Sequence, residues 1–246
     1  MKILILTGSP RKNGNSNLLV DNFIKGAQEK GHSILRFDSA FKKVHPCVAC
    51  NKCNMGADEC VFKDDFEEVK NNIVEADMVV FASPMYYFGI SAQLKSVIDR
   101  FYGINDKIHV PKKSALIMTY ADSADIEAEP IKSHFKRLNR YLGWQEVGQI
   151  IAKGVWQAGA VNGTGYPETA ALKIKAAVSN GRVKLSALRR LFFFCRRAAD
   201  HFNIRLKYRY SVLSSTNTTS GRLLNRNGII LFPRPRLTTI FVFPSV

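Results

Sequence analysis

Apolar and polar positions alternate along residues 1–180 in a pattern typical of strands that are each followed by a helix. Residues 2–7 form a largely apolar run that stops at Gly8, as expected of a strand buried on both faces. A helix is indicated next by Leu19, Phe23 and Ala27, which lie four residues apart on one stripe. The predicted strands span residues 2–7, 33–37, 77–82, 114–119 and 149–155, and the predicted helices span residues 17–30, 64–76, 92–102, 130–142 and 167–178.

Five strands that alternate with five helices predict a parallel sheet with right-handed crossovers and helices on both faces. No apolar stretch approaches the roughly 20 residues that are needed to span a bilayer. The first strand also runs directly into Gly8 and Ser9, without the small-residue cleavage site of a signal peptide. The cytosol is therefore the expected compartment.

The formal net charge of +16 lies mostly in the C-terminal part of the chain. Residues 181–246 contain 13 Lys and Arg but only Asp200 as an acid, whereas residues 1–180 contain 23 bases and 19 acids. This predicts a domain over residues 1–180 and a basic, Arg-rich tail over residues 181–246. The tail is interpreted as an arm for a membrane surface or nucleic acid, as an accessory subdomain, or as translation outside the natural reading frame.

The loop between the first strand and the first helix has the features of an anion site. A helix N-terminus offers unpaired N–H groups and a partial positive charge at the carboxyl edge of the sheet. Further donors would come from Ser9, Arg11, Asn15, Ser16 and Asn17. A Walker A loop is excluded, and so is a dinucleotide fingerprint, because neither motif is present. The loop suits a single terminal phosphate; alternatively, it is a solvated turn in which Asn15 or Ser16 only caps the helix.

A second loop, after the third predicted strand, is rich in aromatic side chains. It contains Pro84, Met85, Tyr86, Tyr87, Phe88 and Gly89. Next to the switch point of a parallel sheet, such a loop can hold a flat ring. Alternatively, its aromatic residues pack on the following helix or form a dimer contact. The two loops together fit flavin mononucleotide (FMN), which has a phosphate at one end and a planar heterocycle at the other.

The same residues resemble the flavodoxin-like NADPH-dependent FMN reductases, of which the iron–sulfur flavoproteins are a branch. The resemblance covers roughly residues 1–178, through Gly-Ser-Pro-Arg at 8–11, Gly-Asn-Ser at 14–16, Ala-Ser-Pro-Met-Tyr at 82–86 and Ile-Asp-Arg-Phe at 98–101. It implies a flavodoxin-like doubly wound sheet of strand order 2-1-3-4-5, bound FMN and a homodimer or tetramer. By position it assigns the phosphate to the five polar residues of the first loop, the ring to residues 84–89, and a third FMN loop to Tyr120 and Ala121.

Four of the five cysteines lie close together, at Cys47, Cys50, Cys53 and Cys60. In a cytosolic chain such clustering favours metal or redox chemistry over structural disulfides. Three thiols at two-residue intervals and a fourth from a loop suit a 4Fe–4S cluster, whereas zinc usually takes two separated pairs, and free or redox-active thiols are the third alternative. The spacing resembles that of the iron–sulfur flavoproteins. Because the segment follows the second strand, we expect it near the flavin, at the same sheet edge as the FMN loops.

The sequence thus predicts an FMN-dependent NAD(P)H oxidoreductase. A nicotinamide cofactor would give hydride to the flavin, which would pass electrons to a small-molecule or protein acceptor. No catalytic side chain is assigned, because the chemistry belongs to the cofactor. One alternative is an iron–sulfur flavoprotein that takes electrons from ferredoxin. The other is a binding module driven by the basic tail, against which the near-neutral body argues; we expect neither nucleic acid nor membrane as a partner.

Overall fold

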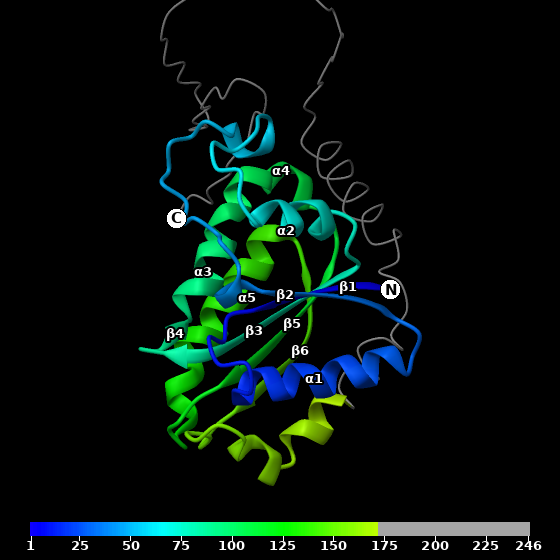
Figure 1. Cartoon of the computed structure of the whole chain (residues 1–246), viewed down its shortest axis with the longest axis vertical. Helices are drawn as coiled ribbons and strands as arrows, with labels where there is room; N and C mark the ends of the chain where they lie inside the picture. The colour runs from blue at the N-terminus through cyan, green and yellow to red at the C-terminus, as the bar shows by residue number, and fades with distance from the viewer. Residues whose placement is uncertain (172–246) are drawn as a thin grey trace, which may run out of the picture. The chain divides into compact units, whose positions relative to one another are not determined.

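A five-stranded parallel sheet forms the centre of the computed structural model, which describes residues 1–171 (Figure 1). The strands are β1 (Lys2–Thr7), β2 (Ser33–Asp38), β3 (Met78–Tyr86), β5 (Lys113–Thr119) and β6 (Gln145–Ala152). They lie in the order β2-β1-β3-β5-β6, and every adjacent pair is parallel. A two-residue strand, β4 (Gly89–Ile90), pairs antiparallel with the end of β3. Without β4, this is the predicted order 2-1-3-4-5.

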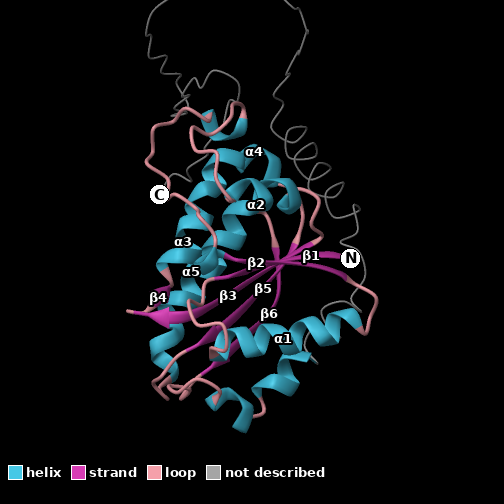
Figure 2. Ribbon diagram, viewed as in Figure 1, coloured by secondary structure: helices cyan, strands magenta, loops and turns pink. Residues whose placement is uncertain are grey.

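Both faces of the sheet are apolar because helices cover each of them. Alternate residues of a strand point to opposite faces. Leu4 and Leu6 of β1 belong to one apolar cluster, and Ile3 and Ile5 belong to the other. The helices are α1 (Asn15–Gln28), α2 (Phe66–Ile73), α3 (Ala92–Asp99), α4 (Asn105–Ile108) and α5 (Glu129–Leu142). Figure 2 shows α1 on one side of the sheet, together with the helical residues after β6, and α2, α3, α4 and α5 on the other side.

Strand β3 extends four residues beyond its predicted end at Ala82. Pro84 still stands opposite Thr119 of β5, and the next two residues, Met85 and Tyr86, pair with the returning strand β4. A proline is tolerated there because it occupies the last position of the pairing with β5, where a missing N–H costs least. The predicted stop at Ser83-Pro84 is therefore wrong, and the strand carries Met85 and Tyr86 past the sheet edge.

Three other elements differ from their predicted bounds by three residues or more at one end. Helix α2, predicted over residues 64–76, spans Phe66–Ile73. The helix predicted over residues 92–102 ends at Asp99 and continues as a 3-10 turn and then α4. Strand β6 begins at Gln145, just after the left-handed Gly143 that ends α5, and stops at Ala152. The 3-10 turns span Ser39–Phe41, Asn54–Gly56, Arg100–Ile104, Asp125–Ala128 and Ala160–Gly163.

The last predicted helix begins at residue 166 and is described as far as residue 171. Its remainder, the boundary at residue 180 and the tail over residues 181–246 lie outside the described residues. Within residues 1–171, none of the helices has the length and apolar character that a bilayer span requires.

Candidate functional site

A cavity of about 220 Å³ opens where the carboxyl ends of the central strands meet. It is called the edge cavity here, and its walls come from residues 9–16, 84–86, 119–121 and 155–158. The first three segments follow β1, β3 and β5 or form their ends, so parallel pairing brings them to one edge. This is the position at which open parallel sheets bind ligands.

The first segment is a tight turn that leads directly into α1. Helix α1 begins at Asn15, and its N-cap is Gly14, without a capping side chain. The alternative in which Asn15 or Ser16 caps the helix is therefore wrong. A Cβ at Gly14 would lie 2.9 Å from Ser9 Oγ and 3.1 Å from Arg11 Cβ, so only glycine allows the turn to close this tightly. The Ser9 hydroxyl donates to the Arg11 carbonyl oxygen at 3.1 Å.

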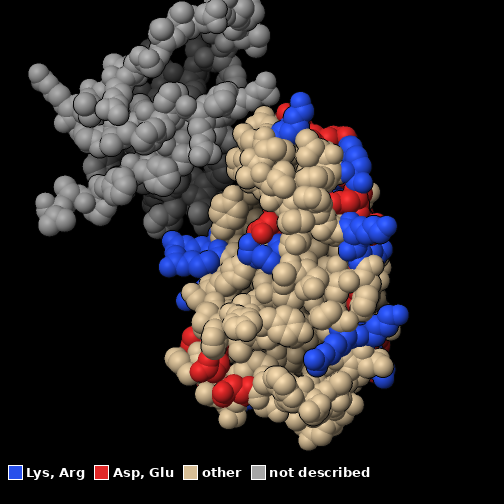
Figure 3. All heavy atoms as spheres, turned by 60° about the vertical axis from the view of Figure 1, so that its left-hand side comes forward, with Lys and Arg blue, Asp and Glu red and all other residues tan. Residues whose placement is uncertain are grey.

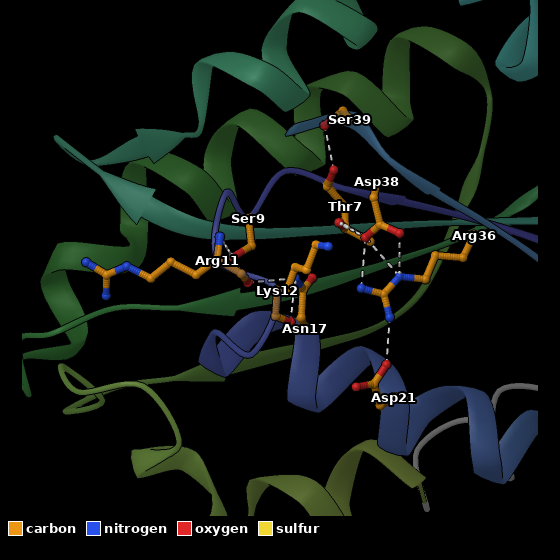
Figure 4. Close-up of polar contacts among 9 residues, drawn as sticks. All are labelled: Thr7, Ser9, Arg11, Lys12, Asn17, Asp21, Arg36, Asp38 and Ser39. Carbon is orange, nitrogen blue, oxygen red and sulfur yellow. Dashed lines mark hydrogen bonds and ion pairs between the residues drawn. The ribbon is translucent and has the colours of Figure 1, made fainter. Parts of the chain in front are cut away.

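The Asn17 side chain holds this turn in place by hydrogen bonds to its backbone (Figure 4). Its Nδ2 donates to the carbonyl oxygens of Arg11 (2.9 Å) and Lys12 (3.2 Å). The side chain is fully buried and is not part of the wall of the edge cavity. Its Oδ1 has no hydrogen-bond partner within the described residues. Ser16, by contrast, does line the cavity, and its hydroxyl is 3.0 Å from that of Thr119, which ties the first segment to β5.

Of the predicted ring-binding residues, Pro84, Met85 and Tyr86 line the edge cavity. Tyr87 and Phe88 instead form the tip of the β3–β4 hairpin, with φ values of 45° and 61°. Two central residues with positive φ are the geometry of a type I′ turn, which turns the chain back on itself. Tyr87 is consequently 99% exposed, and it lies outside the cavity wall together with Phe88 and Gly89.

Tyr120 and Ala121, which the resemblance assigns to a third FMN loop, line the edge cavity. The Tyr120 hydroxyl donates to the Ala124 carbonyl oxygen at 3.0 Å. Burial raises the pKa of Tyr120 above its ordinary value, so the phenol stays protonated near neutral pH. The tyrosine thereby holds the turn after β5 in place.

The fourth wall, residues 155–158, was missed by the sequence reasoning. It contributes Val155, Trp156 and Ala158, and Trp156 is 71% exposed. The sequence predicted a strand over residues 149–155 and so placed Val155 in the sheet, whereas β6 ends at Ala152 and Val155 belongs to the loop that lines the cavity. Gly14 and Thr119 also line the cavity and were not predicted, although Thr119 ends a predicted strand at the correct edge.

The four clustered cysteines lie in a separate place, on the segment of residues 47–60, called the cysteine segment here. Cys47 and Cys50 are exposed, Cys60 is half-buried and Cys53 is buried, and all four are free thiols. The 3-10 turn of this segment packs against the turn over Arg100–Ile104 and against α4 (Figure 1). The cysteine segment contributes no residue to the wall of the edge cavity. The expectation that this segment lies near the flavin, at the same sheet edge as the FMN loops, stays a prediction.

Cys53 is the thiol with the strongest structural constraint. A Cβ at Gly103 would lie 3.7 Å from Cys53 Sγ and 4.0 Å from Cys60 Cβ, so these two thiol side chains face the same glycine. Burial raises the pKa of the Cys53 thiol, and the neighbouring Cys60 and Cys47 act in the same direction. Within residues 1–171, however, no three His, Cys, Asp or Glu side chains are arranged to hold a metal ion.

The two ends of the cysteine segment are fastened together by His45, Phe62, Asp64 and Arg100, which are called the neck here. Arg100 is 2% exposed and donates to Asp64 Oδ2 at 2.8 Å and to the His45 carbonyl oxygen at 3.0 Å. The rings of His45 and Phe62 stack with centroids 3.9 Å apart. Burial by itself would raise the pKa of Asp64. The carboxylate accepts hydrogen bonds from Arg100 and from the N–H groups of His45 and Phe66, and these bonds hold the pKa of Asp64 below its ordinary value.

Comparison with known proteins decides what kind of protein has this fold and this cavity. Residues 1–156 match the family described as NADPH-dependent FMN reductase. The chain belongs to this family. The predicted family and the predicted FMN-dependent NAD(P)H oxidoreductase activity are thereby confirmed, with FMN and NAD(P)H as cofactors.

Relatives place this FMN reductase beside the iron–sulfur flavoproteins. An iron–sulfur flavoprotein of Archaeoglobus fulgidus is 32% identical over 157 residues, which are 63% of this chain and 70% of the relative. One of Methanocaldococcus jannaschii is 38% identical over 100 residues, which are 41% of this chain and 51% of the relative. The reductase therefore spans about half the length of the second relative.

A solved structure confirms the flavodoxin-like fold of the reductase. The NAD(P)H:quinone oxidoreductase from Methanothermobacter marburgensis superposes with a TM-score of 0.56 over 72% of this chain and 95% of its own. The sequence identity is 19%, so this likeness concerns the fold alone.

The residues of the edge cavity fit FMN in their chemistry. The first segment offers the N-terminus of α1, the Ser16 hydroxyl and Arg11, which are donors for a phosphate. The other walls offer Tyr86, Met85 and Trp156, which are suited to a flat ring. The cysteine segment has four thiols, the ligands that an iron–sulfur cluster requires, but their arrangement here is not that of a metal site.

Proposed function

We propose that the edge cavity is the FMN site of this reductase, with the phosphate at the N-terminus of α1 and the ring against residues 84–86 and 119–121. One observation carries the proposal. Three loops that are far apart in the sequence, and that were assigned to FMN from the sequence alone, contribute to the wall of a single cavity.

The residues of the first segment would bind the phosphate by charge and by hydrogen bonds. Arg11 makes no ion pair with any other described residue, so its guanidinium is free to neutralise a phosphate. Ser9 and Ser16 are nearly fully buried and line the edge cavity. Asn17 would act through the turn, since its amide holds two carbonyl oxygens of that turn.

The remaining walls would hold and orient the ring system. Tyr86 and Met85 supply an apolar surface, and Tyr120 keeps the turn after β5 in place while remaining uncharged. Bound FMN would supply the redox chemistry, with a nicotinamide as hydride donor and a further molecule as electron acceptor. The chain itself binds, orients and shields the ring, and no side chain is required to transfer a proton.

We also propose that the reductase works in the cytoplasm as a homodimer or tetramer and donates electrons to a small-molecule or protein acceptor. Exposed aromatic side chains at the hairpin tip, above all Tyr87 and Phe88, support an interface between copies. Four free cysteine thiols in one segment are typical of a reducing compartment.

A second candidate function, electron transfer through a 4Fe–4S cluster, is favoured by the cysteine segment. Cys47, Cys50, Cys53 and Cys60 would be its ligands, and ferredoxin would be an alternative electron source. The support is the donor chemistry, together with the names of the two relatives described above. Because the described thiols are not arranged around a metal, we derive no electron path through this segment.

Anaerobic reduction of the purified chain tests the proposed function. The protein should contain stoichiometric FMN, its absorbance should bleach with NADH or NADPH, and a quinone should restore it. Stoichiometric FAD without FMN would contradict the FMN site. Bleaching by reduced ferredoxin but by neither nucleotide would favour the second candidate function.

A further inference from the structure

Asn15 uses its side chain to hold a distant part of the chain. The residue begins α1 and is 7% exposed. Its Nδ2 donates to the carbonyl oxygens of Val155 (3.1 Å) and Gln157 (2.8 Å), and its Oδ1 accepts from the Val161 N–H at 3.2 Å. Both amide hydrogens and one oxygen lone pair are therefore used by residues 155–161. No amide donor remains for a phosphate.

The two carbonyl groups that Asn15 binds stand on either side of Trp156. The backbone there is further fixed by the Val155 N–H, which donates to the Tyr120 carbonyl oxygen at 3.0 Å, and by the burial of Val155. Trp156 nevertheless exposes 71% of its surface and lines the edge cavity. A large ring that is exposed on a firmly held backbone is typical of a surface that contacts a ligand.

We propose that Trp156 forms a wall of the flavin site and that Asn15 is the positioning residue that fixes it, not a side-chain ligand of the phosphate. This inference rests on the proposed function, because it requires flavin in the edge cavity. It changes the role that the sequence assigns to Asn15: the side chain links the phosphate turn to the wall around Trp156.

Riboflavin separates the two possible roles of Asn15, because it has the ring but not the phosphate. Loss of a phosphate ligand weakens the binding of FMN and leaves the binding of riboflavin unchanged. Loss of a wall that contacts the flavin body weakens the binding of both by the same factor. The ratio of the two dissociation constants therefore reports which role a side chain has.

The full chain, freed of flavin, is titrated with FMN and with riboflavin. We expect Asn15→Ala to weaken both by roughly tenfold, since it removes three hydrogen bonds. Arg11→Ala should weaken FMN binding alone. The matched control is Asn22→Ala, because the Asn22 Nδ2 also donates to a backbone carbonyl oxygen of α1, that of Leu18 at 2.8 Å. This control should change neither constant.

Tryptophan emission gives a second readout, because the chain has one buried and one exposed tryptophan, Trp144 (5%) and Trp156 (71%). Flavin binding should quench the exposed one strongly. Trp156→Ala should remove this quenched emission and weaken both flavins by the same factor, and it tests the wall even if Asn15→Ala does not fold.

Three results would overturn the inference. A loss of FMN affinity in Asn15→Ala with unchanged riboflavin affinity would make Asn15 a phosphate ligand. Unchanged quenching and unchanged flavin affinity in Trp156→Ala would remove Trp156 from the site. A wild-type chain that binds neither flavin would overturn the proposed function, and this inference with it.

Discussion

At the scale of single residues, buried polar side chains hold the loops in place. Asn15, Ser16 and Asn17 are consecutive, and each is at most 7% exposed. Their partners lie on three different parts of the chain: residues 155–161, Thr119, and the turn before α1. The sequence identified these residues as polar and close to a ligand. It could not separate ligands from positioning residues, because that depends on partners as distant as 146 positions along the chain.

Arg100 is the residue whose loss should destabilise the fold most. We expect Arg100→Met to lower the free energy of unfolding by about 3 kcal/mol, because it removes the charged partner of the partly buried Asp64 carboxylate, which keeps only its two backbone N–H donors. The exposed pair of Lys95 and Asp99 provides a matched control, and Lys95→Met should cost less than about 1 kcal/mol. Urea unfolding measures both. Equal losses in the two variants would show that the neck does not stabilise the fold.

Asp64 should also make stability depend on pH. Because its pKa in the folded state lies below the ordinary value of 3.8, its contribution is complete above that value and is lost as the pH falls through the folded pKa. The difference in free energy of unfolding between the wild type and Asp64→Asn should therefore shrink as the pH falls from about 5 to about 2. Urea titrations across this range measure the difference, and a constant difference would contradict the prediction.

At the scale of elements, apolar runs located all five strands of the main sheet, because buried parallel strands have few polar residues. Bounds were less accurate where local signals were weak. The N-cap Gly14 has no side chain to mark the start of α1, and β4 has only two residues and no periodicity. The early residues of β6 are largely exposed and polar, so the prediction placed the strand too late. The missed wall around Trp156 is a consequence of that shift.

The β3–β4 hairpin predicts separate effects on stability and on association. Replacing Tyr87 and Phe88 with Asn and Gly should raise the free energy of unfolding by about 1 kcal/mol, since those residues suit positive φ. The same change should weaken association if the tip is an interface, whereas FMN affinity should stay the same because neither residue lines the edge cavity. Sedimentation and urea unfolding measure these effects. An unchanged oligomeric state would exclude the tip as the interface.

The cysteine segment gives a prediction that is independent of the edge cavity. On the second candidate function, Cys50→Ser should lose iron and sulfide but keep FMN, because a cluster would need all its thiolate ligands, whereas no cysteine lines the edge cavity. Iron and sulfide analysis of anaerobically purified protein, with FMN content measured in parallel, tests this. Wild-type protein without iron, and with four titratable thiols, would leave a plain FMN reductase.

At the scale of the whole molecule, the parts that make the site belong to residues 1–171. Both apolar clusters and the edge cavity are formed within this range. On the face seen in Figure 3, Lys and Arg side chains are interspersed with Asp and Glu. By sequence, residues 1–180 contain 23 bases and 19 acids, so the excess of positive charge belongs mainly to the tail over residues 181–246.

Truncation tests whether the tail is needed. A chain that ends after residue 180 should keep its FMN content and its melting temperature, because every wall of the edge cavity precedes that point. Thermal unfolding and flavin absorbance of the two chains measure this, with FMN added in excess to both. Insoluble truncated protein would show that the tail contributes to the fold.

The neck has a consequence for how such a protein can evolve. Arg100 contacts residues at both ends of the cysteine segment, at His45, Phe62 and Asp64, so the ends stay joined whatever lies between them. The cysteine segment is therefore a loop whose two ends are held together by the neck. The exposed Cys47 and Cys50 lie outside the wall of the edge cavity, so a lineage could exchange these thiols without altering the residues that line its flavin site.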